Sequence, residues 1–323
     1  MTIYVVFGPT ASGKTKLALS LAERFHSPLL SIDSRKVYKG MDIGTNKLEL
    51  LVAAKERELT LLGVDLVSPA ETVSAYRFRE LVSEQLAALD LIPESLVIFG
   101  GTGLYLDSLL FGLPLGDAAN TELREEISDM SVEQLQLKIS GLDDTALQHM
   151  NDSDRKNPRR LQRVLERLSD TKTTKQEALP VPENIRALFA DATAYFYLPA
   201  VNKSELDEKI TKRVLRYADE GWLAEVKTLL SEFSQDIPGL SIMGYTEVVK
   251  FLALLEQEQT DAVLREVLEK VALIHRQYAK RQVTWSKRYL RDLPTLYKDA
   301  TYFPKSVQRL FYSLNGDVRA AEE

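Results

Sequence analysis

Residues 8–15 have the sequence GPTASGKT, and this stretch decides the fold of the chain. It follows an apolar run at 3–7 and precedes a helical pattern at 14–25 whose apolar residues share one face. A strand, a glycine-rich turn and a helix in this order are the context in which G-x-x-x-x-G-K-[ST] forms a phosphate-binding loop. Backbone N–H groups and the helix N-terminus would hold an anion, Lys14 would add a positive charge, and the Thr15 hydroxyl would ligate Mg²⁺. The loop alone does not identify the phosphate compound.

Length and composition bound the class of protein. The chain has 323 residues, of which 45% are hydrophobic, which is enough to form the core of one large or two modest domains. It contains no cysteine, which excludes disulfides, thiol catalysis and cysteine-ligated zinc. No apolar run approaches the roughly 18 residues of a membrane span, and the first residues enter a strand pattern without room for a signal peptide. We therefore expect a soluble, cytoplasmic protein without a membrane partner. As a separate expectation, we take it to be a monomer.

The charge is unevenly distributed along the chain. The net charge of −6 argues against a general basic coat for nucleic acid. Residues 155–175, however, hold eight Lys/Arg and two carboxylates, and residues 275–291 hold six Lys/Arg and no carboxylate, so each segment carries a local charge of +6. Because local patches rather than net charge decide whether a phosphate backbone can dock, both segments are candidates for binding nucleic acid.

Residues 1–115 alternate between strand and helix patterns. The expected strands cover residues 3–7, 29–32, 62–66 and 96–99. The expected helices cover residues 14–25, 48–59, 75–90 and 103–111. Short strand–helix units that follow a phosphate-binding loop predict an α/β fold, in which a parallel P-loop sheet has helices on both faces.

The pattern changes after this core. Residues 116–190 show helical periods only and predict an all-helical insertion domain, with helices expected at 120–129, 131–139, 143–150 and 157–168. Residues 191–315 return to the core with a strand at 194–199. The C-terminal helices that follow are expected at 203–220, 222–233, 244–256 and 260–290, the last with an apolar stripe. The tail after Asn315 is expected to be loose.

Two strand ends carry the candidate chemistry. Asp33 follows the second strand, and ligands of open α/β sheets bind beyond the carboxyl ends of the strands. We therefore expect Asp33 to face the phosphate loop, where a carboxylate suits a general base or an indirect Mg²⁺ ligand; a helix cap or turn residue is the alternative. The fourth strand ends in Gly100, Gly101 and Gly103, where hydrolytic P-loop enzymes usually have a carboxylate. This ending favours group transfer.

The two basic segments show features suited to RNA. Arg159 and Arg163 lie four residues apart in a helix that begins at Pro158, so they share a face, and guanidinium forks suit phosphates. An ordinary solvated helix is the alternative, although it would carry more carboxylates. The segment 276–285, RQYAKRQVTW, combines cations that grip a backbone with an aromatic ring that can stack on a base. A core position for Trp285 is the alternative there.

Together and in this order, these motifs resemble those of the tRNA dimethylallyltransferase family (isopentenylpyrophosphate:tRNA transferases). The matching pieces are GPTASGKT at 8–15, DSRKVYKGMDIGT at 33–45, GGTGLY at 100–105, SDRKNPRRL at 153–161, KITKRV at 209–214, MGY at 243–245 and RQYAKRQVTW at 276–285. They span nearly the whole chain. The sequence departs from the family at Lys36, where Gln is more frequent, and at Ile274-His275, where Ala-Thr is more frequent.

The resemblance implies that a dimethylallyl group is transferred from dimethylallyl diphosphate to N6 of adenosine 37 of tRNA, with Mg²⁺ and with release of pyrophosphate. It implies catalytic roles for Asp33, as general base, and for Thr10, Lys14 and Arg213 at the leaving group. The residues implied to bind the diphosphate are Gly8, Pro9, Thr10, Ala11, Ser12, Gly13, Lys14, Thr15 and Arg213, with Thr15 as the metal ligand. The positions implied to contact the tRNA anticodon stem-loop are Asp33, Ser34, Arg35, Lys36, Thr102, Arg124, Arg159, Arg160, Leu161, Gln162, Arg163, Ser241, Ile242, Met243, Gly244, Tyr245, Thr246, Lys280 and Arg281.

The physics of such a reaction agrees with these residues. An allylic carbon ionises readily, so the main barrier is the charge on the departing diphosphate, which N–H groups, a lysine and a metal stabilise. The target base must leave its stack to enter the crevice. Three alternatives stay open: an adenylate isopentenyltransferase acting on free nucleotide, a P-loop small-molecule kinase using ATP, and a non-catalytic P-loop protein that binds RNA or regulates.

Overall fold

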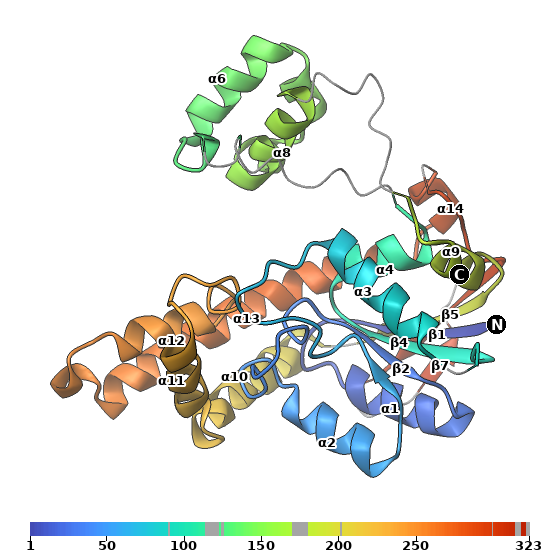
Figure 1. Ribbon diagram of the computed structural model, residues 1–323, viewed down its shortest axis with the longest axis horizontal. Helices are drawn as coiled ribbons and strands as arrows, with labels where there is room; N and C mark the ends of the chain where they lie inside the picture. The colour runs from blue at the N-terminus through green and yellow to red at the C-terminus, as the bar shows by residue number, and fades with distance from the viewer. Residues whose placement is uncertain are drawn as a thin grey trace. The chain divides into compact units, whose positions relative to one another are not determined.

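The protein, seen in a computed structural model, forms two compact units (Figure 1). One unit comprises Met1–Leu113 with Val181–Glu323, and the other comprises Pro114–Pro180. Within them the structure describes residues 1–89, 91–113, 123, 126–169, 180–200, 202–298, 300–313 and 318–320. None of the described helices is both long and apolar enough to cross a membrane.

The first unit is built on a seven-stranded sheet with the order β3-β2-β4-β1-β5-β6-β7. Its strands are β1 (Thr2–Phe7), β2 (Leu29–Ile32), β3 (Leu61–Leu62), β4 (Ser95–Gly100), β5 (Thr193–Pro199), β6 (Ser306–Tyr312) and β7 (Val318–Ala320). Neighbouring strands run parallel except β6 and β7, which are antiparallel. All four residues of β2 are buried, as expected for a parallel strand covered on both faces. The predicted α/β P-loop fold is confirmed.

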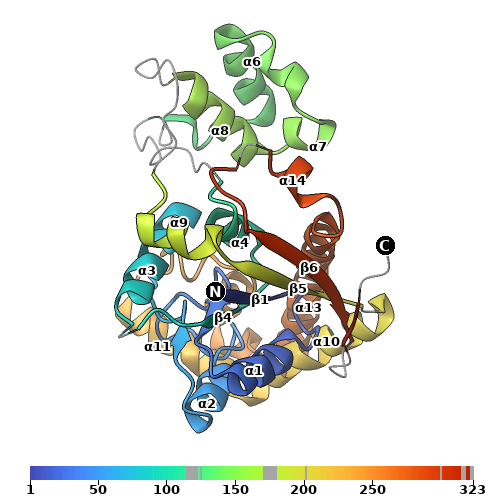
Figure 2. The ribbon, with the colours of Figure 1, turned by 90° about the vertical axis from the view of Figure 1, so that its right-hand side faces the viewer.

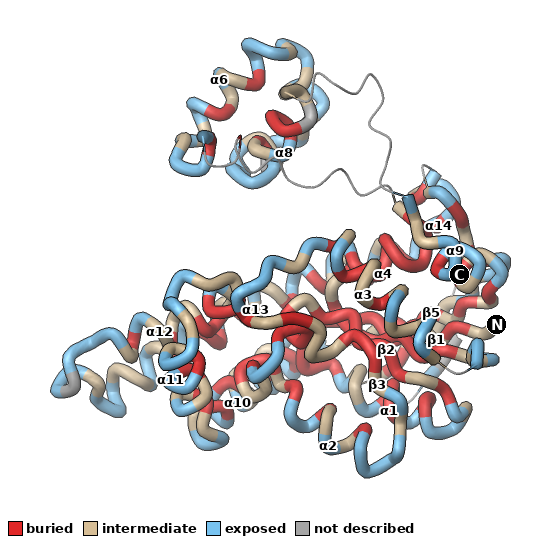
Figure 3. The backbone as a smooth tube through the Cα atoms, in the orientation of Figure 1, coloured by how far each residue is buried: buried red, intermediate tan, exposed pale blue. Residues whose placement is uncertain are grey.

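Helices cover both faces of this sheet, as Figures 1 and 2 show. On one face lie α1 (Lys14–Phe25) and α2 (Leu48–Glu56), and on the other lie α3 (Ala75–Ala87), α4 (Gly103–Leu110) and α9 (Glu183–Ala190). Buried residues follow the strands and the inner faces of these helices (Figure 3). The apolar face of α1, with Leu17, Ala18, Leu21 and Ala22, contributes to this core.

A second group of helices packs beyond the carboxyl ends of the parallel strands (Figure 1). It comprises α10 (Lys203–Asp219), α11 (Trp222–Glu232), α12 (Tyr245–Leu252) and α13 (Asp261–Arg288), and the short α14 (Leu293–Leu296) follows α13. Helix α10 packs along α13, and α12 packs against both α11 and α13. Because the phosphate loop also lies at this end of the sheet, these helices can supply side chains to it.

The described part of the second unit consists of helices. They are α6 (Val132–Leu142), a 3-10 helix (Ala146–His149), α7 (Asp152–Arg155) and α8 (Pro158–Ser169). Helix α6 begins with a capping box, in which Ser131 and Gln134 satisfy each other's backbone N–H groups. Its core is formed by the buried residues Leu123, Ile127, Leu135, Ile139, Leu161, Val164 and Leu165. The prediction of a helical insert agrees with this unit.

Several expectations need correction. The third strand has two residues instead of 62–66, because Gly63 turns the chain with a φ of 76°. The strand β6 was not predicted, and the tail expected to be loose forms β7 over 318–320. Helix α9, placed in the insert at 116–190, belongs to the first unit, where Asn184 bonds Ser83 of α3. The helix expected at 120–129 falls largely outside the described residues.

The buried face of α13 also differs from its expected apolar stripe. It consists of Leu268, Val271, Ala272, His275, Ala279, Gln282 and Ser286. Among its polar members, Gln282 bonds the backbone of Thr10 and Gly101, and Ser286 bonds the Gln282 carbonyl of its own helix. A search restricted to apolar periodicity passes over them, because it scores a buried Gln or His as an interruption.

Asp107 is a buried carboxylate that joins α4 to the C-terminal helices. Its Oδ1 accepts hydrogen bonds from the hydroxyls of Tyr289 at 2.7 Å and Tyr297 at 3.0 Å. Burial raises the pKa of Asp107 from its usual 3.8 to about 6, and the two tyrosine hydrogen bonds oppose this rise. A carboxyl with a raised pKa in the folded state contributes stability that is full below its unfolded pKa and lost as the pH rises through about 6.

We therefore expect Asp107→Asn to flatten the pH dependence of stability between pH 4 and pH 7. Relative to the variant, the wild type should be more stable at pH 4 than at pH 7 by up to about 3 kcal/mol, the free-energy equivalent of a shift of roughly two pKa units. Urea unfolding of both proteins across this range measures the difference. Asp191→Asn, at an exposed position, is the matched control, and parallel curves for wild type and Asp107→Asn would contradict the expectation.

Candidate active site

The phosphate loop connects β1 to α1 in a tight turn. Its backbone bonds the end of β4, because Gly8 N donates to the Gly100 carbonyl at 3.2 Å. Ala11 and Gly13 have left-handed conformations, with φ of 62° and 82°. A Cβ atom on Gly8 would lie 2.5 Å from the Tyr312 hydroxyl, so this position has room only for glycine. The loop therefore presents its N–H groups and the N-terminus of α1 to a common space, as an anion-binding turn requires.

Three side chains from distant parts of the chain hold the loop. Gln282 Oε1 accepts a hydrogen bond from Thr10 N at 2.9 Å, and Arg213 Nη1 donates to Thr10 Oγ1 at 3.1 Å. The hydroxyls of Ser12 and Tyr312 share a hydrogen bond of 2.9 Å. Gln282 and Tyr312 are buried and were missed as site residues. Gln282 lies in the motif RQYAKRQVTW, which could have pointed to it. Tyr312 lies in the unpredicted strand β6, where no sequence motif pointed to it.

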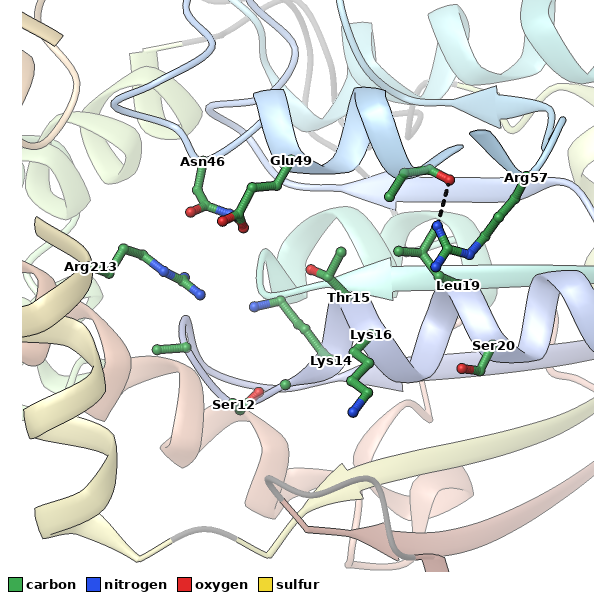
Figure 4. Close-up of a pocket in the computed structure, with 13 residues that line it drawn as sticks. Ser12, Lys14, Thr15, Lys16, Leu19, Ser20, Asn46, Glu49, Arg57 and Arg213 are labelled. Carbon is green, nitrogen blue, oxygen red and sulfur yellow. Dashed lines mark hydrogen bonds between the residues drawn. The ribbon is translucent and has the colours of Figure 1, made fainter. Parts of the chain in front are cut away.

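A cavity of about 380 Å³, the loop cavity, opens beside this loop (Figure 4). Lys14 and Arg213 extend into the same space from opposite sides, and Thr15 lies beside Lys14. Burial lowers the pKa of Lys14 to about 7; Asp33 opposes this effect, and Arg213 and Arg35 add to it. A bound anion would favour the charged form of the lysine. The loop cavity thus suits a compound with a diphosphate group.

A smaller cavity of about 20 Å³, the Asp33 cavity, adjoins the loop cavity. Thr10, Lys14 and Arg213 line it on the loop side, and Asp33 and Lys36 line it on the side of β2. Since Lys14 and Arg213 line both cavities, the two spaces share a wall. The predicted meeting of Asp33 with the phosphate loop across the crevice is confirmed.

Asp33 is an ionised carboxylate, and one of its two oxygens accepts hydrogen bonds from Arg35. Its Oδ1 accepts hydrogen bonds from Arg35 N at 3.0 Å and Arg35 Nε at 3.4 Å. Burial alone would raise its pKa, but the charges of Arg35 and Lys36 and the backbone hydrogen bond hold that pKa well below its usual range. Among the described residues all its hydrogen bonds go to Oδ1. The second oxygen is therefore available to a ligand.

A stack of side chains connects Asp33 to the surface of α13. The Arg35 guanidinium lies 5.2 Å from the ring centre of Tyr278, and the guanidinium of Arg281 lies 5.6 Å from the same ring. Arg281 and Lys280 are exposed. The basic segment 276–285 thus reaches from solvent to the Asp33 cavity, and cation–π contacts fix its inner end.

The turn after β4 lies beside the same segment. Ser34 N donates to Thr102 Oγ1 at 3.1 Å, which joins two of the positions expected to contact RNA. A Cβ atom on Gly103 would lie 2.2 Å from the indole of Trp285, so the glycine allows this ring to pack against the turn. Trp285 Nε1 donates to the Tyr289 hydroxyl at 3.0 Å. Trp285 is half-buried here, so the core position considered as its alternative is not observed.

Residues 241–246 do not all face the surface. Tyr245 is completely buried, and its hydroxyl donates to Glu225 Oε1 at 2.6 Å. Glu225 Oε2 in turn accepts the backbone N–H groups of Asp42 and Ile43, both at 2.7 Å. The expectation that the Tyr245 side chain contacts RNA is corrected, because it holds Glu225 instead. Gly244 is buried, whereas Ser241, Ile242, Met243 and Thr246 keep exposed surface.

The arginines of α8 have different surroundings. Arg160 is paired with Asp154 at 2.6 Å and Arg163 with Glu166 at 2.5 Å. Arg159 is exposed and lines a surface groove of about 750 Å³ together with Gln162. Leu161 is completely buried in the core of the second unit, so its expected side-chain contact with RNA is corrected. Arg124 lies outside the described residues.

The oxygen ligands available to a metal are few. Among the described residues, no group of three or more His, Cys, Asp or Glu could hold a metal ion. Thr15 lines both cavities and fits Mg²⁺, because this ion keeps several waters and binds through one or two protein oxygens together with substrate phosphates. The residues therefore fit a Mg²⁺ ion that enters with a diphosphate.

Comparison with known proteins gives consistent matches over most of the chain. Residues 36–289 match the family model described as IPP transferase, and residues 1–50 match that described as isopentenyl transferase. A relative from Bacillus licheniformis named tRNA dimethylallyltransferase is 33% identical over 298 residues, covering 89% of this chain and 88% of the relative. A relative of the same name from Gloeobacter violaceus is 31% identical over 284 residues, 88% of each chain.

Solved structures show the same arrangement. The tRNA isopentenylpyrophosphate transferase from Bacillus halodurans matches with a TM-score of 0.58 at 26% identity, covering 92% of this chain and 93% of that one. A eukaryotic dimethylallyltransferase described as acting on tRNA matches with a TM-score of 0.64 at 20% identity, covering 95% of this chain and 73% of that one. The second likeness shows a common fold.

We expect Gln282→Leu to weaken the binding of inorganic pyrophosphate about tenfold. Leucine has a similar volume but leaves the Thr10 N–H and the Gly101 carbonyl without their partner, and an unmade buried hydrogen bond costs on the order of 1–3 kcal/mol. Isothermal titration calorimetry measures the affinity. Gln277→Leu changes an exposed glutamine of the same helix and should bind like wild type; equal affinity for both variants would show that Gln282 does not shape the loop.

Proposed function

The chain belongs to the IPP transferase family, and we propose that it transfers a dimethylallyl group from dimethylallyl diphosphate to N6 of adenosine 37 in tRNA, with release of pyrophosphate. The curated relatives named above carry the name tRNA dimethylallyltransferase. The observation that carries the finer proposal is the position of Asp33, which lines one cavity with Thr10, Lys14 and Arg213. A base and the residues of a leaving-group site thus lie on opposite sides of one small space.

The diphosphate of the donor would occupy the loop cavity. Backbone N–H groups of the loop, the ammonium of Lys14 and the guanidinium of Arg213 then surround its oxygens. Thr15 would hold Mg²⁺, which when bound neutralises part of the negative charge on the diphosphate. Arg213 and Thr10 are joined by a hydrogen bond, so the two side chains lie together beside the space for the leaving group. These groups stabilise the charge that develops on the leaving diphosphate.

Asp33 would remove the proton from the acceptor. The N6 lone pair forms the new C–N bond while the C–O bond to the diphosphate breaks and its electron pair leaves with the pyrophosphate. The nitrogen then carries a positive charge, so its proton is strongly acidic. A carboxylate with a pKa far below its usual range can accept such a proton, and Arg35 keeps it ionised and oriented.

The acceptor would be the anticodon stem-loop of a tRNA. Exposed Arg281 and Lys280 of α13 and the groove-lining Arg159 of α8 offer cations for its phosphates. Adenosine 37 must leave its stack to bring N6 to Asp33, which is a base-flipping step. We propose that the enzyme acts as a monomer in the cytoplasm, where tRNA is modified.

We expect Asp33→Asn to bind both substrates within a few-fold of wild type and to lose about 10²–10⁴ in single-turnover rate, the usual range for a positioned base. Asparagine keeps the size and polarity of the side chain but cannot accept the proton. Mass spectrometry of digested tRNA measures the N6-dimethylallyladenosine formed. The assay is run with labelled dimethylallyl diphosphate and tRNA, free nucleotide or neither.

Asp219→Asn, at an exposed position of α10, is the control for this experiment and should react like wild type. A rate for Asp33→Asn within about threefold of wild type, under 1 kcal/mol of barrier, would leave Asp33 with a structural role only. Transfer to free nucleotide rather than to tRNA would instead identify an adenylate isopentenyltransferase.

We expect Arg159→Glu to weaken tRNA binding and to lower the slope of log affinity against log salt by roughly 0.7–0.9 for each RNA phosphate that the variant no longer neutralises. Filter binding at several salt concentrations measures this slope. Lys138→Glu, a charge reversal in the same unit at a lysine paired with Glu126, is the control. An unchanged slope for Arg159→Glu would place this arginine in solvent, away from the RNA.

A further inference from the structure

Lys36 is a buried cation in the wall of the Asp33 cavity, which adjoins the loop cavity. The residue is 7% exposed, and it lines the Asp33 cavity together with Lys14 and Arg213. Its ammonium donates to the carbonyl of Thr45 at 2.7 Å and to the carbonyl of Asn46. A lysine has three N–H donors, and within the part of the chain that the structure describes these two carbonyls are the hydrogen-bond partners of Lys36. One donor therefore remains for a ligand.

Lys47, a second buried lysine eleven residues after Lys36, shows how a buried positive charge can be neutralised inside the fold. Lys47 has no exposed side chain, and its ammonium pairs with the carboxylates of Asp42 at 2.7 Å and of Asp65. Lys36 has no such pair among the described residues, because its partners are neutral carbonyls. The charge of Lys47 is therefore neutralised by carboxylates inside the fold, whereas the charge of Lys36 is not paired with a carboxylate among the described residues.

A buried charge without a counter-ion destabilises the fold unless a ligand supplies the opposite charge. Burial lowers the pKa of Lys36 to about 7; Asp33 opposes this effect, and Arg35, Arg213 and Lys14 add to it. Asp33, the carboxylate that lines the same cavity, is already bonded to Arg35. Lys14, Lys36 and Arg213 therefore surround a space that suits an anion with more than one negative charge.

The carbonyls that hold Lys36 are themselves fixed. They belong to the segment 42–46, whose backbone N–H groups at Asp42 and Ile43 are accepted by Glu225. The Thr45 hydroxyl donates to the Met41 carbonyl at 2.6 Å, which closes this segment on itself. The ammonium of Lys36 is thus fixed by two backbone carbonyls. Its third N–H donor points away from these carbonyls, because the donors of an ammonium group are arranged as a tetrahedron.

We propose that Lys36 is a third cationic residue for the diphosphate of the donor, acting at its reacting end from the Asp33 cavity, which adjoins the loop cavity. This inference rests on the proposed function and changes one part of it, because the family resemblance places Lys36 with the residues that contact tRNA. Lys36 would donate one hydrogen bond to a diphosphate oxygen next to the allylic carbon. It would thereby stabilise the same developing charge as Lys14 and Arg213.

The test is the affinity of Lys36→Gln for inorganic pyrophosphate, measured by calorimetry without added metal. Glutamine removes the charge but keeps an amide group that can donate to the two carbonyls. Pyrophosphate should bind about tenfold to a hundredfold more weakly than to wild type, as expected for the loss of a hydrogen bond from a charged group. The affinity for tRNA, measured by filter binding, should stay within about twofold. Lys39→Gln, at an exposed lysine of the same segment, is the control and should match wild type in both assays.

Thermal unfolding separates this role from a structural one. Lys47→Gln breaks two ion pairs and should lower the unfolding temperature, whereas Lys36→Gln should leave it unchanged or raise it, since it removes an uncompensated charge. Lys36→Met, with the same expectation for pyrophosphate, replaces Lys36→Gln if that variant does not fold.

The outcomes distinguish the inference from the function on which it rests. If wild type binds pyrophosphate and Lys36→Gln binds it equally well but binds tRNA more weakly, Lys36 contacts RNA and the inference is wrong. If wild type itself does not bind pyrophosphate, the proposed donor is wrong, and the inference is wrong with it.

Discussion

Two hydrogen bonds from the side chain of Gln282 hold the functional end of the molecule together. One joins α13 to the Thr10 N–H, and the other joins it to the Gly101 carbonyl at 3.1 Å. A Cβ atom on Gly101 would lie 2.0 Å from the Gln282 amide, so the glycine turn after β4 exists to admit this side chain. A phosphate loop has to keep a concave backbone even when it is empty. Here that shape is imposed by a helix from the other end of the sequence.

The electrostatics of the site follow from the close packing of its charged side chains. Four cations, Lys14, Arg35, Lys36 and Arg213, lie around one carboxylate, Asp33, and Arg35 neutralises that carboxylate. Burial lowers the pKa values of the two lysines, and repulsion from the neighbouring cations adds to this effect. Such an arrangement is stable only because the surrounding fold enforces it, and it favours a multiply charged anion over a neutral ligand. The site is built for the charge of the leaving group as much as for the substrate.

Local patterns were sufficient to predict the parts of the fold that depend on neighbouring residues. The loop, the strands around it and the place of Asp33 follow from a motif, from hydrophobic periodicity and from the rule that ligands bind at the carboxyl ends of parallel strands. The side chains that hold the loop and the segment 42–46 were not predictable in this way. Gln282, Tyr312 and Glu225 act on residues far away in sequence, and no local pattern encodes such a contact. Leu161 and Tyr245 were assigned to RNA because of the motifs that contain them, whereas their side chains are buried.

The long range of these supports has a consequence for the order in which the protein is made. The bond from Thr10 to Gln282 spans 272 residues, and the bond from Ser12 to Tyr312 spans 300. At a synthesis rate of about 5–20 residues per second, the ribosome completes the loop roughly 15–60 s before it reaches Tyr312. During that interval the nascent chain contains the phosphate motif without the helix and strand that shape it. A product of interrupted translation is therefore expected to hold neither donor nor tRNA productively, so unfinished copies do not compete with finished enzyme for substrate.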